Sequence, residues 1–178
     1  GRLEPFQQLV HSIRPHKGQQ SVAAEILKHL SGSPISRQAK QHVQDPYSFR
    51  CIPQVHGASR DTIEYVASIM LTEVNAVTDN PILYPEENTA ISGGNFHAQP
   101  VAFAADIISM ALCEVGSISE RRSAVLIDRK MSGLPPFLIE HSGVNSGFMI
   151  AQVTAAALVS ESKTLAFPAS VDSIPTSA

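Results

Sequence analysis

Residues 147–165 read GFMIAQVTAAALVSESKTL, and this stretch decides the fold. Drawn as a helix, it carries apolar side chains on nearly every face, among them Phe148, Met149, Ile150, Val153 and Leu158. A helix that is apolar all round has to be enclosed by other elements. Its small residues, including the alanines at 155–157, let neighbouring backbones approach closely. The stretch therefore predicts the centre of a multi-helix bundle that is shared between subunits.

Helical periodicity recurs along the rest of the chain. Apolar residues fall at the spacing of one helix face over residues 19–30, 59–77 and about 100–120. No segment predicts a strand that could build a sheet. We therefore expect an all-α fold, a long-helix bundle. Residues 1–43 would form peripheral helices and a loop, and residues 44–178 would form the bundle core together with the functional loops.

Composition excludes several classes of protein. Of the 178 residues, 43% are hydrophobic and 16% are charged, which allows a core to be buried and is unlike a disordered chain. The net charge is −3 and basic residues are scattered, so nothing favours nucleic-acid binding. The histidines and cysteines lack the spacing of metal ligands, and no phosphate-binding or dinucleotide glycine motif occurs. We expect no bound metal and no nucleotide.

The same sequence suggests a cellular location. No uninterrupted apolar run reaches the roughly 18 residues of a membrane span, and no signal peptide is recognisable. The two cysteines, Cys51 and Cys113, fit reduced thiols. We therefore expect a cytoplasmic protein with no membrane partner. The chain opens with Gly-Arg and stops at Thr176-Ser177-Ala178, and both ends are interpreted as cuts through a longer protein.

A polar constellation precedes the helix predicted over residues 59–77. Gln44, Tyr47 and Arg50 are spaced by three, so a helical turn would place Tyr47 and Arg50 on one face. An arginine fork suits a carboxylate bound through two hydrogen bonds. A phenol can pass or polarise a proton when a nearby cation lowers its pKa. The same residues also fit a capped helix start with exposed polar groups, which is the commoner use of such a pattern.

Two further irregular segments contain glycines. Residues 92–97, SGGNFH, predict either a tight loop that presents Phe96 to a pocket or a simple turn into the next helix. Residues 141–148, HSGVNSGF, are interpreted as a capped entry to the apolar helix. Their glycine spacing does not match the G-x-S-x-G motif of a hydrolase, so a hydrolase nucleophile is excluded.

Several motifs, taken in order, resemble the aromatic amino-acid ammonia-lyases. They are QDPYSFRCIPQVHG (44–57), NAVTDNP (75–81), ISGGNFHAQPVA (91–102), SERR (119–122), LPPFL (134–138), GVNSGFMIAQVTAAAL (143–158) and SVDSIPTSA (170–178). The match runs from about Gln44 to the C-terminus, and the ordered set is far more specific than any one motif. Pro46 after Gln-Asp and His97 after Asn-Phe resemble the histidine ammonia-lyase branch. Tyrosine and phenylalanine ammonia-lyases and the related aminomutases stay open as alternatives.

The resemblance implies both a fold and a reaction. The fold is the central part of the helical architecture that ammonia-lyases share with fumarases. The reaction is the loss of ammonia from L-histidine to give trans-urocanate. The family's cofactor is 4-methylidene-imidazol-5-one (MIO), an electrophile formed from an internal Ala-Ser-Gly triplet. No such triplet occurs among the 178 residues, and the family's glutamate that follows Ser-Ala-Asn-Gln is also missing, so we expect this chain alone to be inactive.

The resemblance also implies roles for individual residues. Arg50 would bind the substrate carboxylate, and Tyr47 would assist proton transfer or cofactor formation. Gln44 would hydrogen-bond near the cofactor, and Phe96 would pack against it. The family implies a homotetramer whose active sites are built from several subunits. A non-catalytic helical oligomerisation module is the alternative from another class. The fumarase and argininosuccinate lyase group is disfavoured, because its serine-rich loop with Met-Pro and Lys-x-Asn is not found.

Overall fold

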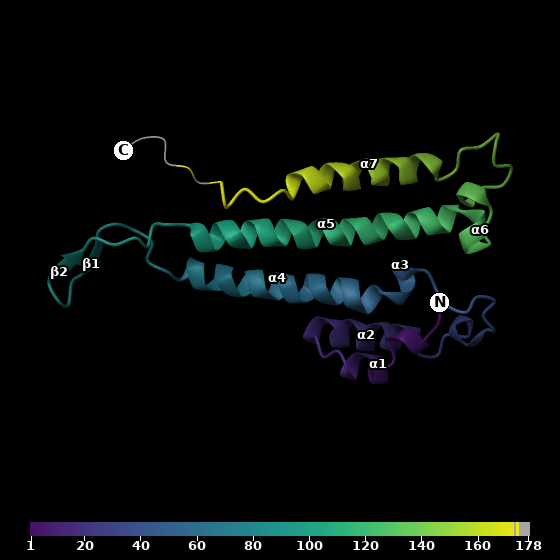
Figure 1. Cartoon of the computed structure of the whole chain (residues 1–178), viewed down its shortest axis with the longest axis horizontal. Helices are drawn as coiled ribbons and strands as arrows, with labels where there is room; N and C mark the ends of the chain where they lie inside the picture. Colours follow the sequence, from purple (N-terminus) through teal and green to yellow (C-terminus); the bar gives the residue numbers. More distant parts are fainter. Residues whose placement is uncertain (173, 175–178) are drawn as a thin grey trace.

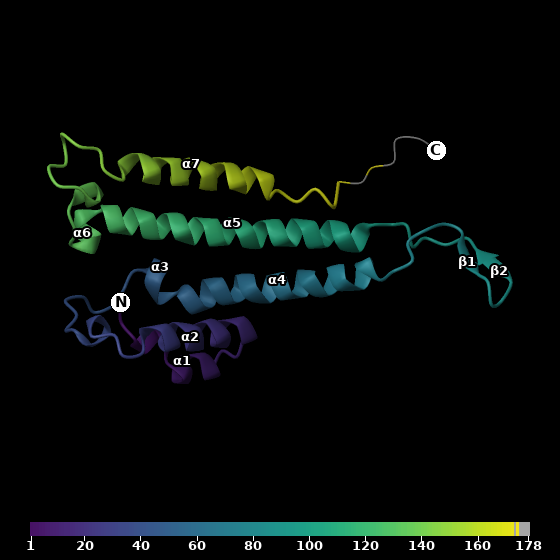
Figure 2. The same ribbon diagram turned by 180° about the vertical axis from the view of Figure 1, so that it is seen from behind.

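Three long helices lie side by side and define the molecule. They are α4 (Ile52–Val74), α5 (Gln99–Ile127) and α7 (Met149–Leu165), and α2 (Lys17–Leu30) covers the outer side of α4 (Figures 1 and 2). The computed structural model describes residues 1–172 and 174. Residues 173 and 175–178 of the C-terminal motif lie outside this described part. The predicted all-α bundle is confirmed.

Because α4, α5 and α7 alternate in direction, their connections gather at two opposite ends (Figures 1 and 2). The first, which we call the α3 end, holds α3 (Tyr47–Arg50), α6 (Arg129–Ser132) and the start of α7. The second, the hairpin end, holds the connection from α4 to α5 and the segment after α7. The remaining short helices are η1 (Glu4–Phe6), α1 (Gln8–Ser12), η2 (Ile35–Arg37) and η3 (Pro136–Leu138).

The helix boundaries refine the sequence predictions. Both α2 and α7 begin within two residues of the predicted positions. By contrast, α4 begins at Ile52 rather than at residue 59, because Pro53 occupies its first turn, where a missing N–H costs no hydrogen bond. The other long helix, α5, starts with Pro100 in its first turn as expected, and it continues to Ile127 rather than ending near residue 120.

One prediction about strands was wrong. The connection between α4 and α5 contains a small antiparallel hairpin, β1 (Ile82–Tyr84) with β2 (Thr89–Ile91), in the register Ile82 to Ile91. Asn88 adopts a φ of 49° in the turn, a conformation that asparagine tolerates better than most residues. The hairpin projects beyond the ends of the long helices (Figure 1), so it extends the surface rather than the core.

Helices α2 and α4 approach each other closely at two glycines. A Cβ added to Gly18 would lie 2.2 Å from the Gly57 carbonyl oxygen, and one added to Gly57 would lie 2.4 Å from the Gln19 backbone nitrogen. The backbone N–H of Gly18 also donates to Asp61 Oδ1 at 2.7 Å. Only glycine permits this approach of two backbones. The N-terminal segment is therefore held directly against the helix that follows α3.

The apolar helix α7 is not enclosed within this chain. None of its residues is buried, and Ile150, Val153 and Leu158 are all more than half exposed, although α5 packs against one side of the helix. The expectation of an enclosed helix is thus not met by the described residues alone. Covering the remaining face of α7 requires protein from outside these residues.

Helix α5 bears on the expectation that the sequence has no apolar run long enough to span a membrane. By length and composition α5 is long and apolar enough to cross a membrane, although polar residues interrupt its apolar stretches. It lies between α4 and α7 and carries the buried carboxylate of Glu120, which accepts a hydrogen bond from Gln152 of α7. These contacts are those of the central helix of a bundle, and we describe it as one.

Candidate active site

The structure brings Gln44, Tyr47 and Arg50 together at the α3 end. They line one side of an open cavity of about 330 Å³, together with His42, Asp45, Pro46, Lys130 and Met131. The Arg50 guanidinium lies over the Tyr47 ring, 4.9 Å from its centroid. Its Nε donates to the Asp45 carbonyl oxygen at 3.2 Å. Within the described residues its two terminal nitrogens make no hydrogen bond, so they are free to face a ligand.

Tyr47 stands between two cavities. The second, also about 330 Å³, lies on the α5 side of the ring and is lined by Pro46, Tyr47, Ser48, Arg121, Ala124, Val125, Asp128 and Met131. The Tyr47 side chain is 73% exposed, so a molecule in either cavity can contact it. A phenol beside a stacked guanidinium can exchange a hydrogen bond with a bound carboxylate or amine, and the cation favours negative charge developing nearby.

Short α3 is held in place by a residue that sequence reasoning did not single out. Arg122 of α5 donates from Nε to the Ser48 carbonyl oxygen at 3.0 Å, and its Nη2 lies 2.8 Å from His56 Nε2 of α4. Burial, and then the charge of Arg122, lower the pKa of His56. Burial also lowers the pKa of Arg122. A neutral imidazole can accept the arginine hydrogen bond, whereas a protonated one cannot.

The neighbouring Glu120 fastens α7 to α5. Its carboxylate is almost fully buried, and it accepts from Gln152 Nε2 at 2.8 Å and from Arg121 Nε at 2.5 Å. The hydrogen bond from Arg121 is the main cause that lowers the pKa of Glu120. The run SERR (119–122) contributed to the family resemblance, but no feature of the sequence alone indicated which element each of its side chains would reach.

Phe96 lies at the opposite end of the molecule. It follows the hairpin, is 60% exposed, and contributes to neither cavity at the α3 end. Helix α4 alone, with 23 residues, separates the two ends by about 35 Å. The four predicted site residues therefore do not share one pocket within a single chain. Three gather at the α3 end and the fourth is displayed at the hairpin end.

The hairpin end is organised by its own hydrogen bonds. Gln99 Nε2 donates to the Ser170 carbonyl oxygen at 3.0 Å. Asp106 accepts from the backbone N–H groups of Ala169 at 3.1 Å and Ser170 at 2.9 Å, and also from the Ser170 hydroxyl. These hydrogen bonds lower the pKa of Asp106, that from the Ser170 hydroxyl most of all. The segment after α7 is thereby fixed beside the start of α5, close in sequence to Phe96.

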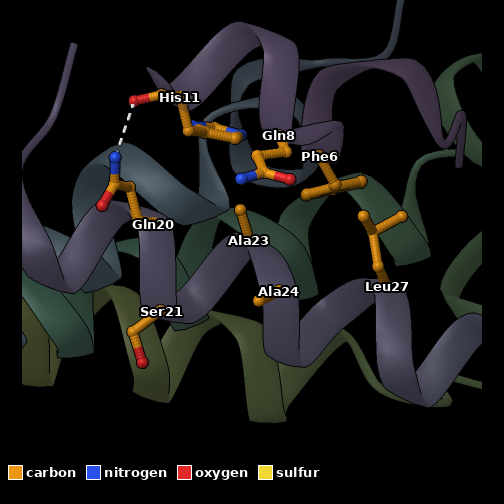
Figure 3. Close-up of a pocket in the computed structure, with 8 residues that line it drawn as sticks. All are labelled: Phe6, Gln8, His11, Gln20, Ser21, Ala23, Ala24 and Leu27. Atoms are coloured by element: carbon orange, nitrogen blue, oxygen red, sulfur yellow. Dashed lines mark hydrogen bonds between the residues drawn. The ribbon is translucent and has the colours of Figure 1, made fainter. Parts of the chain in front are cut away.

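A further cavity lies among the N-terminal helices and has a structural explanation. It measures about 590 Å³ between α1 and α2, and Figure 3 shows Phe6 and Leu27 at one side and His11 with Gln20 at the other. His11 is 1% exposed, and both ring nitrogens have partners at 2.9 Å, the Pro5 carbonyl oxygen and the Gln19 amide. The imidazole is thus a hydrogen-bonded core residue. Among residues 1–172 and 174, no three potential metal-ligating side chains cluster.

Comparison with known proteins gives the same architecture. A histidine ammonia-lyase of Burkholderia cenocepacia (strain HI2424) is 56% identical over 180 residues, which cover 100% of this chain and 36% of that protein. The crystal structure of a histidine ammonia-lyase from Trypanosoma cruzi matches with a TM-score of 0.87 and 46% identity, over 99% of this chain and 32% of that one. A Pantoea agglomerans phenylalanine aminomutase matches with a TM-score of 0.89 and 32% identity, over 99% and 38%.

The fold is therefore that of a segment of the helical ammonia-lyase and aminomutase architecture. The profile of the family described as aromatic amino acid lyase matches residues 1–178, and the chain belongs to this family. It spans about a third of the length of the curated relatives it matches. The sequence-based assignment to the family is thus confirmed over the whole chain.

Proposed function

We propose that the protein containing this chain is a histidine ammonia-lyase, which eliminates ammonia from L-histidine to give trans-urocanate. The observation that carries the proposal is the identity of 56% with a histidine ammonia-lyase along the entire chain. The cluster of Gln44, Tyr47 and Arg50 around one cavity supports it, because the three groups suit an amino acid substrate. The enzyme would thus be a carbon–nitrogen lyase of histidine degradation.

Arg50 would bind the substrate carboxylate. Its Nε is already engaged by the Asp45 carbonyl oxygen, which fixes the plane of the guanidinium and leaves the two terminal nitrogens for a bidentate contact. Stacking on Tyr47 limits the rotation of both side chains. A carboxylate held there would place the reacting carbons of the substrate near the Tyr47 hydroxyl. Orientation of this kind supplies much of the advantage of an enzyme over solution.

Tyr47 and Gln44 would handle protons and polar contacts. The β-proton of histidine is weakly acidic, so its removal needs a positioned base and an activated substrate. The Tyr47 hydroxyl would assist proton transfer, and the Gln44 amide would donate and accept hydrogen bonds at the rim of the cavity. An amide and a phenol are also a suitable donor set for a polar heterocycle. In the family, MIO supplies the electrophile that activates the substrate.

The 178 residues would not be active alone. They contain no Ala-Ser-Gly triplet from which MIO could form. We propose that the triplet lies elsewhere in the longer protein. We further propose a homotetramer whose active sites are shared, so that Phe96 of one subunit packs beside the α3 end of another. The distance between Phe96 and Arg50 within one chain and the uncovered apolar face of α7 support this arrangement. Free Cys51 and Cys113 are in keeping with the cytoplasmic location that we also propose.

The alternative substrates come from the same family. The likeness to a phenylalanine aminomutase, with a TM-score of 0.89, favours a tyrosine or phenylalanine ammonia-lyase or an aminomutase as the second candidate. A non-catalytic oligomerisation module is the third, and the exposed apolar face of α7 is the observation in its favour.

An absorbance assay on the complete protein separates these functions. With L-histidine we expect the ultraviolet absorbance of urocanate to grow, and with the isolated 178 residues we expect none. Turnover of phenylalanine or tyrosine, to an aryl acrylate or a β-amino acid, in place of histidine would overturn the substrate assignment. Lack of turnover with all three amino acids would favour the non-catalytic module.

A further inference from the structure

Arg122 joins three elements at the α3 end. It belongs to α5, its Nε donates to the carbonyl oxygen of Ser48 on α3, and its Nη2 is paired with His56 Nε2 on α4. The partners are 74 and 66 residues away along the chain. A planar guanidinium can hold two such acceptors in a fixed relation, which a lysine ammonium does not. The side chain therefore fixes where α3 sits relative to both long helices.

The element that Arg122 holds has little stability of its own. Helix α3 has four residues and no side-chain cap, and at Cys51, with φ −97° and ψ 14°, the chain leaves α3 before α4 begins. A single helical turn is not stable without tertiary contacts. Ser48, at the buried side of α3, is 7% exposed, whereas its neighbour Tyr47 is 73% exposed. The bond to the Ser48 carbonyl thus acts on the backbone that carries Tyr47 and Arg50.

The partners of Arg122 indicate a geometric role. Its guanidinium is partly withdrawn from solvent, and burial lowers its pKa. Within the described residues it has no carboxylate partner at salt-bridge distance, whereas its neighbour Arg121 binds Glu120. A cation withdrawn from water with only neutral acceptors gains less than an ion pair would. The effect of these contacts is to fix the positions of Ser48 and His56 relative to each other.

We infer that Arg122 is a positioning residue of the active site, which acts through the Ser48 carbonyl to hold Tyr47 and Arg50 in register with α5. The role in catalysis rests on the proposed ammonia-lyase function, whereas the hold on α3 does not. His56 is the second support of the same guanidinium. Arg122 itself touches neither substrate nor cofactor in this assignment.

The test compares Arg122→Gln with Arg122→Lys in the complete lyase. We expect Arg122→Gln to lower kcat/KM about 10- to 100-fold, with an increase in KM as well as a decrease in kcat, because Arg50 and Tyr47 shift together. Arg122→Lys keeps one donor and should recover part of the loss. Hydrogen exchange of the amides of residues 47–51 should become faster in Arg122→Gln, while the rest of the protein keeps its protection. The matched control is Arg60→Gln, which removes only exposed ion pairs with Glu25 and Glu64.

The two readouts separate failure of this inference from failure of the proposed function. If wild-type protein converts no histidine, the exchange of residues 47–51 still decides whether Arg122 holds α3. Unchanged exchange in Arg122→Gln, or a KM and kcat equal to those of Arg60→Gln, would overturn the inference. If Arg122→Gln does not fold, Arg122→Lys decides: slower turnover with faster exchange at residues 47–51 supports the role, and wild-type behaviour in both measurements refutes it.

Discussion

The two ends of the helical bundle are built in different ways. At the α3 end, contacts within the chain position two of the predicted site residues: Arg122 donates to Ser48 of α3, and Arg50 stacks on Tyr47 beside a cavity. At the hairpin end, Asp106 fixes the backbone, yet Phe96 remains 60% exposed. One end is thus organised by contacts within this chain, and we propose that the other becomes part of a site only when another subunit covers it.

The largest expected effect concerns the contact between α2 and α4, the helix that follows α3. Gly57→Ala would place a Cβ 2.4 Å from the Gln19 backbone nitrogen, and neither backbone can move without separating α2 from α4. We expect a loss of about 3 kcal/mol in the free energy of unfolding, measured as a lower Tm of the complete protein. Gly116→Ala in α5 is the control, because nothing lies within 4 Å of its added Cβ. Equal Tm values for the two variants would show that the α2–α4 contact is looser than described.

Removing the Arg50 guanidinium tests whether the α3 end binds the substrate carboxylate. In the complete lyase, Arg50→Ala should raise KM by the equivalent of about 2–3 kcal/mol, since it deletes a charge-assisted contact to the substrate carboxylate. Steady-state kinetics with L-histidine measures the change. Arg60→Gln again serves as control, because its ion pairs are exposed and remote from the cavity. An unchanged KM in Arg50→Ala would rule out the carboxylate role.

Glu120 provides a test of how the stability of the protein depends on pH. Its pKa is lowered, mainly by the hydrogen bond from Arg121. A lowered pKa means that the unfolded state binds the proton more tightly, so this stabilisation is present above the ordinary glutamate pKa and is lost as pH falls through the folded value. Glu120→Gln should cost about 1–2 kcal/mol near neutral pH and flatten the acid limb of a plot of Tm against pH. A variant that follows the wild-type acid limb would contradict the assignment.

The smallest effect is expected at the hairpin end. Asp106→Asn weakens the hydrogen bonds that hold Ala169 and Ser170, all of them near the surface. We predict faster amide exchange at residues 169–170 and no shift in Tm. The pKa of Asp106 is lowered by the same hydrogen bonds, so the protection of these amides in wild type, measured against the intrinsic exchange rate at each pH, should also decrease as pH falls below the ordinary aspartate pKa. Protection that is independent of both pH and the substitution would exclude Asp106 as the anchor.

Local patterns predicted the helices better than the contacts between them. The apolar stretch at 147–165 located α7 to within two residues, because periodicity and composition act within one element. The start of α4 was predicted at residue 59, whereas Pro53 marks the real first turn. The hairpin escaped notice because strands of three residues are too short for an alternation to be seen. The division into residues 1–43 and 44–178 stays a prediction.

The candidate site was predictable only in part. Spacing by three correctly placed Tyr47 and Arg50 on one turn, since that relation lies within four residues. The contacts of Arg122 span 74 and 66 residues, and no local pattern encodes them. The separation of Phe96 from Arg50 did have a signal: the helix predicted between them was already long enough to hold them far apart in one chain. The roles assigned to these residues stay predictions.

Subunit complementation tests the central claim most directly. Complete lyases carrying Arg50→Ala or Phe96→Ala would be produced separately and by co-expression, and the urocanate formed would be compared. If each site takes Arg50 from one subunit and Phe96 from another, about a quarter of the sites in random mixed oligomers contain both wild-type residues, so activity should rise well above that of either parent. Co-expression of Arg50→Ala with Tyr47→Phe, both at the α3 end, should give no such rise. Absence of recovery in the first mixture would contradict a site shared between the two ends.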